Sequence, residues 1–232
     1  MVEPKYSGNI GGVARVMANF DFHNLYLVNP SCELDDECYK RAMHAQEIVE
    51  NTKVFKSFEK AIKDMDYVVA TSSVESKNDK RFLRNAVSLE FFSKKIFETT
   101  GRVALVFGRE DYGLLNEEIA VCDLLVRIPT SESYPSLNLS HAVGVVLYSL
   151  FIYKGVKTRK KTRVIEGIEK EKLYGFFSDL LDEIEYPIHK KENTKVLFRR
   201  VMGRAMPSKW EYHTFMGVLS KTLNEIKKRK KV

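Results

Sequence analysis

The sequence is poor in cysteine, proline and tryptophan. The scarcity of cysteine in particular disfavours some classes of protein. The three cysteines, Cys32, Cys38 and Cys122, cannot all form disulfide bonds with one another, and they lack the close pairs of a zinc site. We therefore expect reduced cysteines that behave as small apolar residues, as is usual in the cytoplasm. The five histidines are scattered, and no motif joins them to other metal ligands, so we expect no metal site.

Long apolar runs and the common phosphate-binding motifs are also missing. The longest apolar stretch, residues 142–153, is too short to span a bilayer, and residues 1–9 lack the apolar run of a signal peptide. Neither a G-x-x-x-x-G-K-[ST] loop nor a G-x-G-x-x-G fingerprint occurs. These absences disfavour membrane proteins, nucleoside triphosphatases and dinucleotide-dependent enzymes.

Charge is abundant, but it is unevenly distributed along the chain. The net charge is +7, and residues 155–232 hold 20 basic and 10 acidic residues, whereas residues 1–154 hold 18 and 21. A near-neutral part is thus followed by a basic part. A basic appendage of this kind suggests a polyanionic partner, although a solvated helical face would have the same composition.

The first part of the chain alternates apolar runs with helical patterns, and 44% hydrophobic residues suffice for a large core. Strands are predicted at residues 25–28, 53–55, 66–71, 103–107 and 124–128. Helices are predicted between them, at residues 10–19, 33–49, 58–63, 89–97, 116–121 and 137–153. The strand runs are apolar throughout, which is typical of a parallel sheet buried on both faces. The predicted fold class is therefore α/β, with a mostly parallel sheet and helices on both faces.

Beyond residue 154 the pattern is helical only. We divide the chain into an α/β domain at residues 1–154, a basic linker at residues 155–165, and a small all-helical, basic domain at residues 166–232. Helices are expected at residues 165–188, 194–206 and 208–228. Pro187 and Pro207 stand at their boundaries, because a proline disfavours helix at the residue before it.

Three polar clusters beside predicted strand or helix ends are candidates for a ligand site. They are Asn9-Ile-Gly-Gly-Val-Ala-Arg15, Phe107-Gly-Arg-Glu-Asp-Tyr-Gly113 and Tyr134-Pro-Ser-Leu-Asn-Leu139. Open α/β sheets bind ligands at the carboxyl ends of their strands, which is where these clusters are expected to lie. Taken singly, each cluster is equally well explained by ordinary turn chemistry or helix capping.

In combination and in this order, the clusters resemble the three motifs of the SpoU/TrmH branch of the SPOUT methyltransferases. The first motif, N-x-G-x-x-x-R, is matched by Asn9, Gly11 and Arg15. The second, hhFGxExxGLxxE, is matched by Phe107, Gly108, Glu110, Gly113, Leu114 and Glu117. The third, S-L-N before an apolar residue, is matched by Ser136, Leu137, Asn138 and Leu139. The resemblance covers residues 3–154, extends more loosely to the C-terminal helices, and is closest to the TrmJ type, which modifies the tRNA anticodon loop.

The resemblance implies an α/β domain whose C-terminal part is threaded into a deep trefoil knot. It also implies a homodimer, with the active site completed across the dimer interface. Family members usually begin with a strand that leads into the first motif. Here Val2 and Glu3 follow Met1 directly, so we expect either that this N-terminal strand is missing or that translation starts upstream.

The resemblance further implies transfer of a methyl group from S-adenosylmethionine to a ribose 2′-hydroxyl of RNA. The positions that match the donor site are Thr71, Ser72, Ser73, Gly108, Ile128, Pro135, Ser136 and Leu137. The positions that match the catalytic site are Arg15, Asn9, Glu110, Ser136 and Asn138. A guanidinium with a pKa above about 12 is a poor proton acceptor, so we expect Arg15 to anchor a phosphate and stabilise the ribose alkoxide.

The expected substrate is tRNA, with nucleotide 32 of the anticodon loop as the target. Arg199, Arg200 and Arg204 are expected to contact the RNA backbone, although a solvated helix face would also place arginines there. Two other functions remain open: a 2′-O-methyltransferase that acts on ribosomal RNA, and a catalytically inactive RNA-binding member of the family. The helical C-terminal extension favours tRNA, and the presence of all three motifs argues against an inactive protein.

Overall fold

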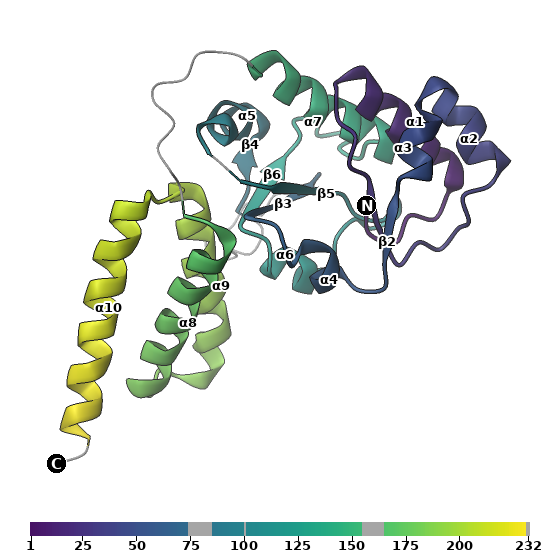
Figure 1. Cartoon of the computed structure of the whole chain (residues 1–232). Coiled ribbons are helices and arrows are strands. Elements are labelled where there is room, and N and C mark those ends of the chain that lie inside the picture. Colours follow the sequence, from purple (N-terminus) through teal and green to yellow (C-terminus); the bar gives the residue numbers. More distant parts are fainter. Residues whose placement is uncertain (74–84, 100, 155–164, 231–232) are drawn as a thin grey trace.

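Strands alternate with helices along the first part of the chain, and helices alone make up the rest (Figure 1). The computed structural model describes residues 1–73, 85–99, 101–154 and 165–230, so the predicted linker lies almost entirely outside the described residues. The strands are β1 (Tyr26–Val28), β2 (Lys53–Phe55), β3 (Tyr67–Ser72), β4 (Val87–Ser88), β5 (Val103–Val106) and β6 (Leu124–Arg127). The helices are α1 (Ser7–Asn19), α2 (Asp36–Ala42), η1 (Met43–Ala45), α3 (Gln46–Glu50), α4 (Phe58–Ile62), α5 (Leu89–Lys95), η3 (Ile96–Glu98), α6 (Asn116–Ala120), α7 (Leu139–Tyr153), α8 (Gly167–Glu183), α9 (Ile188–Ala205) and α10 (Lys209–Arg229).

All strand pairings between named strands are parallel, which confirms the predicted α/β class. The sheet order is β4-β6-β3-β5, and β1 pairs separately with β2. The two-residue strand β4 was not predicted, because two residues carry no periodic pattern. The threading of this domain as a trefoil knot stays a prediction.

The first three residues join the two sheets into one layer. On one side, the Val28 N–H donates to the Met1 carbonyl at 2.9 Å, and the Glu3 N–H donates to the Val28 carbonyl at 2.8 Å. On the other side, the Val2 N–H donates to the Phe107 carbonyl at 2.9 Å. The expected loss of the N-terminal strand is therefore only partly right. No regular strand forms there, but Met1 to Glu3 lie between β1 and β5 in the place of one.

Alternate residues of the central strand β3 face two separate cores, as a parallel sheet covered on both sides requires. Tyr67 and Val69 belong to the core beneath α1, α5 and α7. Val68 and Ala70 belong to the core beneath α4 and α6. This alternation explains why the strand is apolar throughout, and it confirms helices on both faces.

Helix α1, which carries the first motif, crosses α2 at a distance that only glycine permits. A Cβ atom on Gly11 would lie 2.0 Å from the Cys38 carbonyl oxygen. On another side of α1, Gly12 faces Ser140 of α7, whose Cβ would lie 3.3 Å from an added Cβ. The glycines of the motif thus bring α1 close to its neighbours and hold Asn9 and Arg15 in place.

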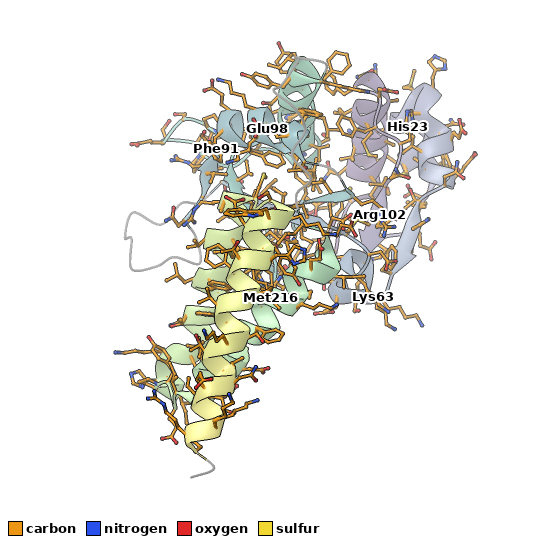
Figure 2. The ribbon with its side chains drawn as sticks, turned by 60° about the vertical axis from the view of Figure 1, so that its left-hand side comes forward. His23, Lys63, Phe91, Glu98, Arg102 and Met216 are labelled. Atoms are coloured by element: carbon orange, nitrogen blue, oxygen red, sulfur yellow. The ribbon has the colours of Figure 1, made fainter. Side chains whose placement is uncertain are left out.

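The C-terminal helices form a bundle that stands off the α/β domain, as Figures 1 and 2 show from two sides. Their core contains Ile165, Leu173, Met202 and Tyr212, and Met216, labelled in Figure 2, packs against it. The predicted helix over residues 165–188 ends earlier, at Glu183, and the next one begins earlier, at Ile188. Pro187 explains both boundaries, because it disfavours helix before it and suits the position just before the next helix.

A buried ion pair joins the bundle to the sheet. Lys170 of α8 donates to the Asp123 carboxylate at 2.6 Å, and the two side chains are 4% and 2% exposed. The Val68 N–H donates to the same carboxylate oxygen at 2.9 Å, and the Lys170 ammonium lies 4.2 Å from the Tyr67 ring centroid. The two parts of the chain are therefore held together by buried charge as well as by apolar packing. Among the described residues, no helix is long and apolar enough to cross a membrane.

Candidate active site

The carboxyl ends of β3, β5 and β6 meet around a cavity of about 350 Å³. All the positions that the sequence assigned to the methyl donor line it: Thr71, Ser72, Ser73, Gly108, Ile128, Pro135, Ser136 and Leu137. They come from four separate segments of the chain, which the parallel order of the strands brings to one edge of the sheet. Glu110, assigned to catalysis, lines the same cavity.

A second, larger cavity of about 690 Å³ lies beside Met1 between β1 and β5, and its lining is mostly apolar. His23 and Arg102, both labelled in Figure 2, line it, and it continues the gap that residues 1–3 fill in part. None of the residues predicted for donor binding or catalysis lines this cavity. The smaller cavity, where polar groups converge, is therefore the candidate site.

The loop that follows β5 folds back on itself at the floor of the candidate site. The backbones of Arg109 and Gly113 bond to each other in both directions, at 3.1 Å and 3.0 Å, and Gly113 has a φ of 71°. A Cβ atom on Gly108 would lie 2.2 Å from the Gly113 carbonyl carbon. Glycine is therefore needed at both positions, for close approach at Gly108 and for the left-handed turn at Gly113.

Arg109, which was not among the predicted site residues, bonds this loop to two neighbouring segments. Its side chain is buried and donates to Glu3 at 2.7 Å and to both carboxylate oxygens of Glu118, at 3.0 Å and 2.9 Å. These hydrogen bonds raise the pKa of Arg109 and lower the pKa of Glu3. Because Glu118 also accepts from the Leu115 N–H at 2.7 Å, one guanidinium joins the N-terminal segment, the loop and the start of α6. No local pattern predicts this cluster, since its members are far apart in the sequence.

Three of the predicted catalytic residues share a chain of hydrogen bonds beside the cavity. The Asn9 amide donates to Glu110 at 2.8 Å, and the Asn138 amide donates to the Asn9 side-chain oxygen at 3.1 Å. The Lys5 N–H donates to the other oxygen of Glu110 at 3.1 Å. Side chains from three motifs are thus fixed against one another across more than a hundred residues of sequence.

Asn138 has a second task, since it caps α7. Its side-chain oxygen accepts from the Ser140 N–H at 2.9 Å and from the Ser140 hydroxyl at 2.7 Å. Asn138 is therefore the N-cap residue of α7. Ser136 instead lines the cavity, from a loop in which the Thr130 hydroxyl donates to the Pro135 carbonyl at 2.9 Å.

Arg15 lies apart from the other predicted catalytic residues. It is exposed on α1 and does not line the candidate site. It follows Asn9 by six residues, which places the two side chains about 120° apart around the helix axis. Arg15 therefore points to a different side of α1 from Asn9, which is bonded to Glu110.

The three arginines predicted to bind RNA differ in their surroundings. Arg200 is 1% exposed and donates to the Ile119 carbonyl at 2.6 Å, and burial lowers the pKa of its guanidinium to about 10. Arg199 forms two bonds with Glu171, at 2.9 Å and 3.2 Å, and lies over the Tyr174 ring. Arg204 is half-buried near the end of α9. The expectation for Arg200 is corrected here, since a side chain buried between domains cannot reach an RNA phosphate.

The cysteines and metal-ligating residues do not form a further reactive centre in the described parts of the chain. Burial raises the pKa of Cys38 to about 11 and that of Cys122 to about 12, so both thiols stay protonated near neutral pH. Across residues 1–73, 85–99, 101–154 and 165–230, no group of three or more His, Cys, Asp or Glu side chains is placed to hold a metal ion.

Comparison with known proteins relates the whole chain to one group. The profile of the SpoU rRNA Methylase family matches residues 1–148, which include all three motifs. The chain is 44% identical over 222 residues to the tRNA (cytidine-2′-O-)-methyltransferase TrmJ of Methanocaldococcus jannaschii, covering 93% of this chain and 95% of that protein. It is 34% identical over 236 residues to the enzyme of the same name from Sulfolobus acidocaldarius, covering 99% and 94%.

The fold is similar to that of solved structures as well. The crystal structure of TrmJ from Z. mobilis ZM4 matches with a TM-score of 0.72 and 27% identity, and the match covers 95% of this chain and 96% of that one. The helical C-terminal bundle is thus part of the match, together with the α/β domain.

Proposed function

The chain belongs to the SpoU methylase family, and on that basis we propose that it transfers a methyl group from S-adenosylmethionine to a ribose 2′-hydroxyl of tRNA. One observation carries the proposal. The eight positions assigned to the donor from sequence line a single cavity, and the hydrogen-bonded residues Asn9, Glu110 and Asn138 lie beside it. The relatives named above, whose names specify tRNA, support the choice of substrate.

The cavity suits the donor in size and in chemistry. Its volume of about 350 Å³ falls within the range of small-molecule sites, and its walls combine backbone groups, hydroxyls and apolar side chains. Thr71 to Ser73, Gly108, Ile128 and residues 135–137 would hold the donor. When bound, S-adenosylmethionine supplies an electrophilic methyl group on a sulfonium.

Asn9 and Asn138 are assigned to orient the ribose. Each amide carries two N–H groups, and the bonds described above use one N–H of each, which leaves one per residue to donate to the substrate. Glu110 and Ser140 fix how the two amides are turned. Orientation of this kind lowers the barrier because the reacting atoms are already in line before the reaction begins.

We infer a homodimer in which Arg15 completes the site of the partner subunit. Arg15 is exposed and turned away from the cavity of its own subunit. Helix α7 carries exposed apolar side chains, among them Tyr148, Phe151 and Ile152. Phe20, at the C-terminal end of α1, packs against the rings of Tyr148 and Phe151. An apolar face of this kind supports contact with a second copy. The guanidinium would bind a phosphate and stabilise the alkoxide that forms on the ribose.

The basic helical bundle is proposed to hold the tRNA backbone, with nucleotide 32 as the target and the cytoplasm as the location. Of the three arginines predicted for this role, Arg204 is the best placed, because Arg199 is bonded to Glu171 and Arg200 is buried. Arg204→Glu is expected to weaken tRNA binding. The slope of the logarithm of the binding constant against the logarithm of the salt concentration should become less negative by about one to two. Binding would be measured between about 50 and 200 mM salt, the range over which phosphate contacts weaken steeply.

Lys53→Glu is the matched control for Arg204→Glu, since Lys53 is exposed on β2, at the sheet edge away from α9. Equal effects of the two charge reversals on the salt slope would rule out a specific role for Arg204.

Gly108→Ala is expected to weaken donor binding by about 10- to 100-fold, because the loop must shift by about an ångström to admit the new methyl group. Isothermal titration with S-adenosylmethionine measures this directly. Gly175→Ala is the control, because nothing lies within 4 Å of a Cβ atom at Gly175 on α8, and its donor affinity should stay unchanged. Unaltered donor affinity in Gly108→Ala would place the donor elsewhere.

Methyl transfer from labelled donor to tRNA and ribosomal RNA transcripts, with the product nucleotide mapped, tests the proposed function. We expect a 2′-O-methyl group at nucleotide 32 of tRNA. A product on ribosomal RNA alone would favour the alternative that the family's name suggests. The absence of a 2′-O-methylated product from every RNA, with the donor bound, would indicate an inactive RNA-binding member.

A further inference from the structure

A tyrosine at a position that the second motif leaves unspecified stands at the edge of the candidate site. Tyr112 lies in the loop after β5 and is 59% exposed. It lines the same cavity as Gly108, Glu110 and Ser136. A large aromatic side chain is thus presented to solvent beside the proposed ribose site.

Two cations hold the Tyr112 ring. The Arg109 guanidinium lies 5.3 Å from the ring centroid, and the Lys5 ammonium lies 5.9 Å from it, both within the range of a cation–π contact. Each cation is itself paired: Arg109 is bonded to Glu3 and Glu118 in a buried cluster, and Lys5 is paired with Asp111 at the surface. These contacts favour one position of the ring before a ligand arrives.

The backbone restrains the same residue. Gly113 directly follows Tyr112 and occupies the left-handed region, and the Arg109–Gly113 hydrogen bonds close the loop around it. The neighbouring residue Glu110 is bonded to Asn9 and to the Lys5 backbone. The loop that carries the ring is thus hydrogen-bonded to the residues assigned to orient the ribose.

We propose that Tyr112 is a stacking platform for a nucleobase of the RNA substrate, next to the ribose that is methylated; this rests on the proposed function. Proteins bind unpaired RNA bases by stacking them on aromatic rings, and every base offers a suitable face. A ring that is already immobilised loses little side-chain entropy on binding, which strengthens the contact. Tyr112 would then act on RNA affinity rather than on donor binding or methyl transfer itself.

Tyr112→Ala and Tyr112→Phe, compared with the wild-type protein, test the assignment. Removal of the ring should raise the KM for tRNA and the Kd for fluorescently labelled tRNA by about 5- to 150-fold, the range that loss of one stacked base produces. The kcat at saturating RNA and the Kd for S-adenosylmethionine should stay within about twofold. Phenylalanine keeps the stacking face and should restore RNA affinity.

Phe91→Ala is the matched control. Phe91, labelled in Figure 2, is 43% exposed on α5 and has the Lys95 ammonium 5.7 Å from its ring centroid, but it does not line the candidate site. It should leave RNA affinity unchanged. The Tm of each variant distinguishes a folding defect from a loss of stacking. A folding defect would lower the Tm, whereas a loss of stacking would lower RNA affinity at an unchanged Tm.

Unchanged RNA affinity in Tyr112→Ala, with an active wild-type enzyme, would overturn the assignment and leave the proposed function intact. A loss of donor affinity as large as the loss of RNA affinity would also overturn it, because the ring would then belong to the donor site. If the wild-type protein methylates no RNA, the proposed function itself fails, which is a distinct outcome.

Discussion

Arg15→Ala is expected to lower the rate of methyl transfer by about 100- to 1,000-fold, the usual effect of removing one donor that stabilises a developing oxyanion. The Kd for S-adenosylmethionine should not change, because Arg15 does not line the donor cavity. Arg15→Lys should recover little, since an ammonium cannot make the two parallel bonds of a guanidinium to a phosphate. Single-turnover kinetics with saturating donor and tRNA measure the loss.

Arg41→Ala is the control for Arg15→Ala, because Arg41 is an exposed arginine on the adjacent helix α2 and is paired with Glu37. It should retain turnover within about twofold, as expected for a surface ion pair. An Arg15→Ala protein that kept near-normal turnover would remove Arg15 from the catalytic site.

Mixing Arg15→Ala with Gly108→Ala, at a donor concentration too low to load the Gly108→Ala cavity, distinguishes action within one subunit from action across a dimer. If Arg15 serves the partner's cavity, a heterodimer of Arg15→Ala and Gly108→Ala contains one intact site, made of one subunit's cavity and the other subunit's arginine. Random pairing of equal amounts makes half of the dimers mixed, so about a quarter of wild-type activity should return. No recovery after subunit exchange would show that Arg15 acts within its own subunit and would contradict the inferred arrangement.

Lys170→Met is expected to lower the free energy of unfolding by up to about 3–5 kcal/mol, because it removes the cation nearest to the buried Asp123 carboxylate. The Asp123 side chain is 2% exposed and would keep hydrogen bonds from the Val68 N–H at 2.9 Å and the Tyr174 hydroxyl at 3.3 Å, with the Arg199 guanidinium 3.9 Å away. Urea unfolding followed by far-ultraviolet circular dichroism measures the change. The effect should be seen first in the C-terminal bundle, which this ion pair joins to the sheet.

Two comparisons check that the buried charge causes the loss. Adding Asp123→Asn to Lys170→Met removes the buried negative charge and should recover part of the stability. Lys195→Met breaks an exposed pair with Glu192 and should cost about 0.5 kcal/mol or less. A Lys170→Met protein as stable as Lys195→Met would mean that water or other groups already compensate Asp123.

Most of the secondary structure could be predicted because it follows from the local spacing of apolar residues. Each predicted strand in the α/β domain is present within one or two residues, and each predicted helix there has a counterpart, although residues 33–49 divide into α2, η1 and α3. The errors lie where local signals conflict. At Pro187 the apolar spacing continues but the proline disfavours helix before it, so the helix predicted at residues 165–188 ends at Glu183, and the helix predicted at residues 194–206 already begins at Ile188.

The elements, the fold class and the residues that line the candidate site could be predicted from the amino-acid sequence, because they follow from periodicity and from the order of the motifs along the chain. Which of those residues contact one another became known only from the three-dimensional arrangement. It joined Asn9 to Glu110 and Asn138, turned Arg15 away from them, buried Arg200, and built the Arg109 cluster on which Tyr112 rests. It also placed Met1 to Glu3 between β1 and β5, where a strand was expected to be absent. The physical reason is that burial and contact depend on how parallel strands are ordered and how helices cross, and both are set by packing between residues far apart in the chain.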